Sequence, residues 1–163
     1  MANRTFFSEE RRIYWLEEFS DIVNELTGRD ENGRTILPPL YQYNTGVITL
    51  AACLGVKNAR KRGLDSSARR KEISTGTFAS HGLEAYIFMV PLLSNHPLGI
   101  DILRPEHEEA AIHEFEEYAC GGLEMLRGIY DQSAGKSPDA LLQSIITKKQ
   151  DQEPLEIPSL FEV

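Results

Sequence analysis

The chain has 163 residues, of which 41% are apolar and 26% are charged, and its formal net charge is −8 at pH 7. This length and composition fit one globular domain with a hydrophobic core. A bilayer-spanning helix is not expected, because no apolar run reaches the roughly 18 residues that one needs. The first residues lack the long apolar segment of a secretory signal, so we expect a cytoplasmic protein.

Positive charge is concentrated in residues 57–71. Seven cations and one anion, Asp65, give this segment a charge of +6, which leaves −14 for the rest of a chain whose total is −8. Screening limits charge repulsion to about 8 Å at physiological salt, so the local sign of a surface matters more than the total. The cations are Lys57, Arg60, Lys61, Arg62, Arg69, Arg70 and Lys71.

The first predicted element is a helix over residues 9–26, which Ser8 caps and Gly28 ends. Its apolar residues recur at helical spacing and predict a buried stripe. The stripe comprises Leu16, Phe19, Val23 and Leu26.

An extended segment and an apolar helix are expected next. Residues 35–43 are predicted to form an extended arm or an edge segment, because Pro38 and Pro39 lack backbone donors. A second helix is expected from Asn44 or Thr45 to Val56. Its small residues would allow another helix to approach closely; they are Ala51, Ala52, Cys53 and Gly55.

Residues 72–78 are predicted to be short and extended. A third helix is expected after a cap at Ser80, with its end or a kink at Pro91. The longest helix is predicted over residues 106–129, with Pro105 at its start.

Two consecutive glycines interrupt that longest helix. Gly121 and Gly122 should each cost about 1 kcal/mol relative to alanine. Close backbone packing against the second helix, or against another subunit, would explain this cost.

A last helix is expected to start at Ser137, where a cap is followed by proline and aspartate. It is predicted to bury Leu141, Leu142, Ile145 and Ile146. The expected fold is therefore an all-α single domain of about five helices over residues 1–150, with short extended connectors.

An acidic, proline-containing tail follows over residues 151–163. Its apolar residues fit either a docking peptide or a terminus that packs on its own domain; they are Leu155, Ile157, Leu160 and Phe161.

Candidate catalytic and metal-binding residues are sparse. Glu109, His113 and Glu117 stand four residues apart and share one helix face, which suits either a metal or a solvated surface. No other predicted helix offers a matching ligand set, so we expect no metal. The remaining histidines lack a Ser or Cys nucleophile nearby, and a phosphate-binding glycine loop is missing. We therefore expect no enzymatic activity and no cofactor; the histidines concerned are His81, His96 and His107.

The two cysteines, Cys53 and Cys120, fall on predicted helices without Cys-x-x-Cys spacing, so they are expected as reduced core residues.

The cationic segment has two interpretations. Its arginines and lysines, on flexible backbone, would neutralise nucleic-acid phosphates without reading bases. Alternatively, it is a solvated connector. Few aromatic residues interleave with the cations, so single-strand stacking is poorly supported.

Two stretches resemble a known family. Residues 44–57, Asn-Thr-Gly-Val-Ile-Thr-Leu-Ala-Ala-Cys-Leu-Gly-Val-Lys, are similar to the signature helix of the fourth class of Dnd-system-associated proteins. Residues 115–126, an acidic and aromatic run into Gly-Gly-Leu, resemble their second hallmark. The resemblance implies an accessory of bacterial DNA phosphorothioation and its linked restriction, a defence against foreign DNA. It extends more distantly to DndE, a helical oligomer related to ribbon-helix-helix proteins, in which surface lysines bind DNA.

With this resemblance, we expect a non-enzymatic accessory that binds the backbone of double-stranded DNA through the seven cations of residues 57–71. Other defence-system proteins are expected as partners, together with self-association into a homo-oligomer and no membrane contact. The alternative is a scaffold subunit that binds a translocase or nuclease partner without touching DNA. A metal-assisted hydrolase using Glu109, His113 and Glu117 is the third and weakest possibility.

Overall fold

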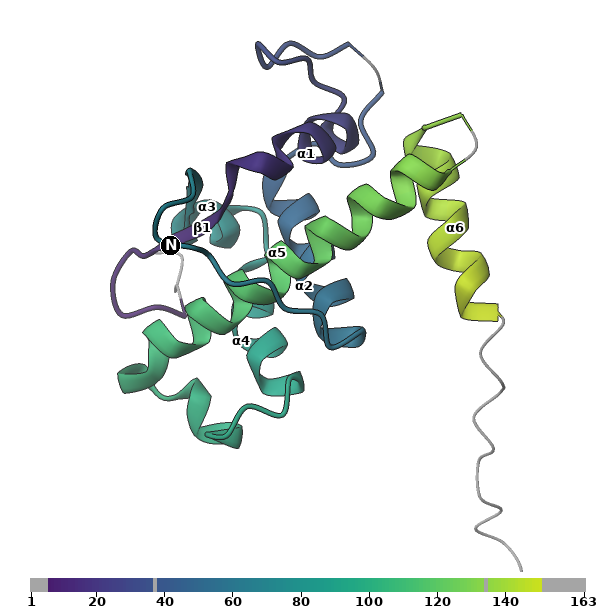
Figure 1. The fold of residues 1–163 in the computed structure, drawn as a ribbon. Helices are drawn as coiled ribbons and strands as arrows, with labels where there is room; N and C mark the ends of the chain where they lie inside the picture. The colour runs from purple at the N-terminus through teal and green to yellow at the C-terminus, as the bar shows by residue number, and fades with distance from the viewer. Residues whose placement is uncertain (1–5, 37, 134, 151–163) are drawn as a thin grey trace, which may run out of the picture.

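The computed structural model describes residues 6–36, 38–133 and 135–150, and helices dominate this part of the chain (Figure 1). In chain order, its elements are β1 (Arg12–Leu16), the 3-10 helix η1 (Glu17–Phe19), α1 (Ser20–Thr27), α2 (Asn44–Lys57), β2 (Arg70–Ser74), α3 (Thr75–Ser80), α4 (Glu84–Leu93), the 3-10 helices η2 (Gly99–Leu103) and η3 (Pro105–His107), α5 (Glu108–Gln132) and α6 (Pro138–Gln150).

The core is built around α5, which runs through the molecule with α2 alongside it (Figure 1). The two backbones touch. An ideal Cβ on Gly122 would lie 1.7 Å from the Ala51 carbonyl oxygen, and one on Gly55 would lie 2.2 Å from the Tyr118 carbonyl oxygen. The close approach of the Gly121-Gly122 helix to the second helix, predicted from the sequence, is confirmed.

The predicted helix over residues 9–26 is wrong in its first half. Residues 12–16 form β1, which pairs antiparallel with β2, with Ile13 opposite Ile73. Ile13 and Trp15 are buried while Arg12 is exposed, which is the alternation of a strand with one covered face. β-Branched and aromatic residues favour this conformation once a partner strand is available.

The second half of that prediction holds. α1 starts at Ser20, and Gly28, at φ 64°, ends it in the left-handed conformation that glycine adopts without strain. The whole predicted stripe is buried, even though a strand, a 3-10 helix and an α-helix share it. It comprises Leu16, Phe19, Val23 and Leu26.

Two further boundaries differ from expectation. The extended segment predicted over residues 72–78 is β2 only as far as Ser74, whose hydroxyl accepts from the Thr77 N–H and caps α3. The rest of that segment belongs to α3, which the sequence did not predict and which ends at Ser80. The third predicted helix is α4, which starts at Glu84 and is not capped by Ser80. Pro91 lies inside α4, which ends two residues later at Leu93.

The C-terminal helices follow the prediction closely. α5 starts at Glu108, after Pro105 has opened η3, and α6 starts at Pro138, where the Ser137 hydroxyl accepts from the Ala140 N–H at 3.2 Å. On α6, Leu141 is buried as predicted, whereas Ile146 is 51% exposed. The predicted tail, residues 151–163, lies outside the described residues.

The all-α prediction is correct for the bulk of the described chain, but it missed the two-stranded sheet of β1 and β2. None of the helices in the described part of the chain combines the length and apolarity needed to cross a bilayer.

Candidate functional site

Within the cationic segment, residues 60–62 lie directly on α5. The Arg62 N–H donates to the Glu117 carbonyl at 3.0 Å, and the Arg60 N–H donates to the Gly55 carbonyl at 2.8 Å. An ideal Cβ on Gly121 would lie 2.1 Å from the Arg60 carbonyl oxygen. The flexible backbone expected for this segment is therefore wrong around Arg60 and Arg62, where contact with α5 fixes it.

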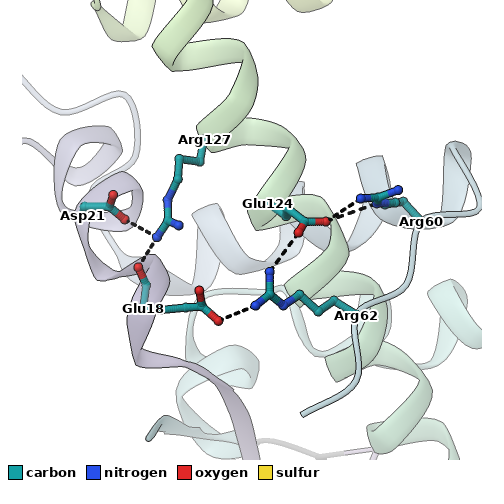
Figure 2. Close-up of polar contacts among 6 residues, drawn as sticks. All are labelled: Glu18, Asp21, Arg60, Arg62, Glu124 and Arg127. Atoms are coloured by element: carbon teal, nitrogen blue, oxygen red, sulfur yellow. Dashed lines mark hydrogen bonds and ion pairs between the residues drawn. The ribbon is translucent and has the colours of Figure 1, made fainter. Parts of the chain in front are cut away.

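Glu124 of α5 binds two of the predicted phosphate ligands (Figure 2). Its carboxylate accepts from Arg60 Nη2 and from Arg62 Nη1, each at 2.8 Å, while Arg62 Nη2 donates to Glu18 at 2.7 Å. The hydrogen bond from Arg60, supported by that from Arg62, lowers the pKa of Glu124. Arg62 thus links η1 to α5.

A third arginine, Arg127, joins this group of contacts. Arg127 donates to the Asp21 carboxylate at 2.9 Å and to the Glu18 carbonyl oxygen (Figure 2). The Arg127 and Arg62 guanidinium groups lie 4.6 Å and 5.2 Å from the centroid of the Phe19 ring. We call this group the Glu124 cluster; its members are Glu18, Asp21, Arg60, Arg62, Glu124 and Arg127. Because its ion pairs are partly exposed, each contributes about 0–1 kcal/mol to the stability of the fold. Together they hold Arg60 and Arg62 against α5 and η1.

Lys61 contacts a different part of α5. Its ammonium lies 2.6 Å from the Glu114 carboxylate, 3.2 Å from that of Glu117, and 5.0 Å from the centroid of the Tyr118 ring. Partial burial acts to lower the pKa of Lys61, but the hydrogen bonds to Glu114 and Glu117 outweigh it and raise that pKa. Since Glu114 is buried, it needs such a cationic partner.

The same contacts bear on the metal-site interpretation. Glu117 is engaged by Lys61, and it lies 3.4 Å from the Nε2 atom of His113. Across the described ranges, no group of three His, Cys, Asp or Glu side chains is placed to hold a metal ion.

The other four predicted cations are exposed, and none of them makes an ion pair with a described carboxylate. None of the described carboxylates lies within ion-pair distance of Lys57 or Arg69. Arg70 donates to the carbonyl oxygens of Leu64 and Asp65, and the Lys71 ammonium lies 5.6 Å from the Trp15 ring centroid. Within the described residues, the predicted site therefore divides into three cations bound to carboxylates of this chain and four without such a partner.

Sequence reasoning missed a row of buried carboxylates that hold the N-terminal segment. The N–H groups of Phe6 and Ser8 donate to Glu84 and Glu108, at 2.8 Å and 2.9 Å. The Tyr14 N–H donates to Glu116 at 2.7 Å. A signal was present, since Glu108 and Glu116 share a helix face with buried Ile112, at spacings of four residues.

Comparison with known protein families identifies a match. A family model described as DNA sulphur modification system-associated protein 4 matches residues 12–160. Neither the curated proteins nor the solved structures contain a match to the chain. The family match confirms the resemblance inferred from residues 44–57 and 115–126.

Proposed function

We propose that this chain, which belongs to the family of DNA sulphur modification system-associated protein 4, is a non-enzymatic assembly component that binds another protein of such a system. The observation that carries this proposal is the pairing of Arg60, Lys61 and Arg62 with carboxylates of this chain. A phosphate would have to compete with those carboxylates for these cations, which favours protein binding over DNA binding.

The surface offered to a partner is apolar. Phe6, Leu92 and Leu103 are exposed, and they border one cavity of about 270 Å³ beside α4. We call these three residues the α4–η2 face. Contiguous exposed apolar side chains are typical of protein interaction sites. A translocase or nuclease of the same system is the partner we expect.

Co-purification tests this proposal. Replacing both Leu92 and Leu103 by aspartate is expected to lower affinity for the partner at least about tenfold, since two charges would enter an apolar contact. The matched control is Ile146→Asp, an exposed apolar residue of α6, which should leave binding intact. Circular dichroism checks that the variants fold. Full retention of the partner by the folded double variant would refute the α4–η2 face as the interface.

A second candidate function is contact with the DNA backbone through the four cations of residues 57–71 that have no described carboxylate partner. It is favoured by Lys57 and Arg69, which are exposed and have no described carboxylate within ion-pair distance. Contact of Lys57, Arg69, Arg70 and Lys71 with four phosphates would give a salt slope near −3.6, from about −0.9 per phosphate. Self-association and a relation to DndE stay predictions from the resemblance.

Binding to plain duplex at several salt concentrations tests the second candidate. Replacing Lys57 and Arg69 by alanine is expected to reduce the salt slope by about 1.8, whereas replacing Arg60 and Arg62 should leave it nearly unchanged. The two double variants remove equal charge, so a difference between them reports position. Equal salt slopes in the two variants would contradict the assignment of DNA contact to Lys57 and Arg69. If the wild-type chain does not bind DNA, only the assembly proposal remains.

A further inference from the structure

A groove runs along the surface between α2 and α4. Near the start of α2, a cavity of about 700 Å³ is lined by aromatic residues that include Tyr41, Tyr43 and His81. Near the end of α2, a cavity of about 250 Å³ is lined by Val56, Lys57, Met89 and Leu93, among others. Both cavities are bordered by Cys53 and Tyr86, so they adjoin each other. We call the two together the α2–α4 groove.

The aromatic end of the groove is held in place by its own contacts. The Tyr43 and His81 rings stack with centroids 4.0 Å apart, and the Thr45 hydroxyl lies 2.8 Å from the Nδ1 atom of His81. The Tyr41 ring lies so close to Gly46 that an ideal Cβ there would be 2.6 Å from it. Aromatic-lined grooves of this kind bind extended, proline-containing segments.

The other end of the groove is apolar and has a cation at its rim. Met89 is 47% exposed and Leu93 is 65% exposed, although α4 is composed almost entirely of apolar residues. A helix that is apolar all round is normally covered on all sides. Lys57 borders this end without a described carboxylate partner. The groove therefore suits an extended segment with prolines, apolar side chains and acidic residues.

We propose that the C-terminal segment Pro154–Phe161 of the same chain occupies the α2–α4 groove. This segment carries two prolines, four large apolar residues and Glu156, and Asp151 and Glu153 precede it. Its acidic residues complement Lys57, and its prolines complement the tyrosines. The family match extends to residue 160, so nearly all of the segment belongs to the matched region.

The dimensions also agree. α2 has 14 residues and is about 21 Å long, and an extended segment of eight residues spans about 25 Å. The linker between Gln150 and this segment is residues 151–153, which span about 10 Å when fully extended. In the proposed arrangement Leu155 and Ile157 cover Met89 and Leu93, and Pro158 lies among the tyrosines.

Disulfide trapping in the full chain tests this proposal, because Cys53 lines both cavities. A cysteine placed at Ile157 is expected to form a disulfide with Cys53 under mild oxidation, in a species of monomer mass. Cys120 is buried and does not compete. The matched control is Glu31→Cys, in an exposed turn, for which we expect no linkage. Absence of the 157–53 disulfide, or its formation only between two chains, would overturn the proposal.

A second measurement needs no added cysteine. If the segment covers the groove nine-tenths of the time, alkylation of Cys53 should be about tenfold faster in a variant carrying Leu155→Asp and Ile157→Asp. These substitutions lie outside the described core, and circular dichroism confirms that the fold is kept. Equal alkylation rates in the variant and in wild type would show that the C-terminal segment does not occupy the groove.

Discussion

Replacing Gly122 by alanine is expected to destabilise the protein by about 3 kcal/mol or more. The new Cβ would lie 1.7 Å from the Ala51 carbonyl oxygen, 2.4 Å from its carbonyl carbon and 2.8 Å from its Cα atom. All three are backbone atoms of α2, so no side-chain rotation relieves the overlap. α2 and α5 would have to separate, and the side chains buried between them would lose contact.

Gly128→Ala is the matched control, since the same change is made in the same helix. Apart from the neighbouring backbone of α5 itself, no described atom lies within 4 Å of an ideal Cβ on Gly128. Alanine there should stabilise the protein by up to about 1 kcal/mol, through the higher helix propensity of alanine. Urea unfolding of both variants measures the difference. Equal effects of the two substitutions would show that the α2–α5 backbone contact does not determine stability.

Glu116→Gln is expected to stabilise the protein above pH 7 and to have little effect near pH 4.5. Burial raises the pKa of Glu116 from 4.5 to about 7, although the Tyr14 N–H and the charge of Arg70 act to lower it. Between these two values the unfolded chain loses this proton while the folded chain keeps it. Wild-type stability therefore falls as the pH rises from 4.5 to 7, and a neutral glutamine removes that loss.

The expected gain is about 3 kcal/mol at pH 8, an upper limit set by the two pKa values. Glutamine retains an oxygen that can accept from Tyr14, so the contact with β1 is preserved. Urea unfolding at pH 4.5 and pH 8 measures the effect, with exposed Glu109→Gln as the control on the same helix. Parallel stability profiles of wild type and Glu116→Gln across this range would disprove the assigned ionisation.

Local signals in the sequence correctly located most of the helices. The small residues of α2 and the Gly121-Gly122 pair predicted that two helix backbones touch, because glycine within a helix is unfavourable without such a contact. Ser137 and Pro138 marked the start of α6, since a cap and a first-turn proline act within a few residues of each other. The family could also be inferred, because its two motifs are short stretches of α2 and α5.

The strand β1 could not be predicted in this way. The apolar stripe Leu16, Phe19, Val23 and Leu26 fits a continuous helix as well as the observed strand and helix. What selects the strand is pairing with β2, whose residues lie more than 50 positions further along the chain. Such a partner has no signature within the segment itself.

The sequence by itself determined which residues carry charge, where most helices form and to which family the chain belongs. Only the tertiary structure decided what the cations of residues 57–71 contact. Arg60, Lys61 and Arg62 meet Glu124 and Glu114, which are 53 to 64 residues away in sequence. A charge is a property of one residue, whereas its electrostatic role depends on the distance to other charges, and only folding sets that distance.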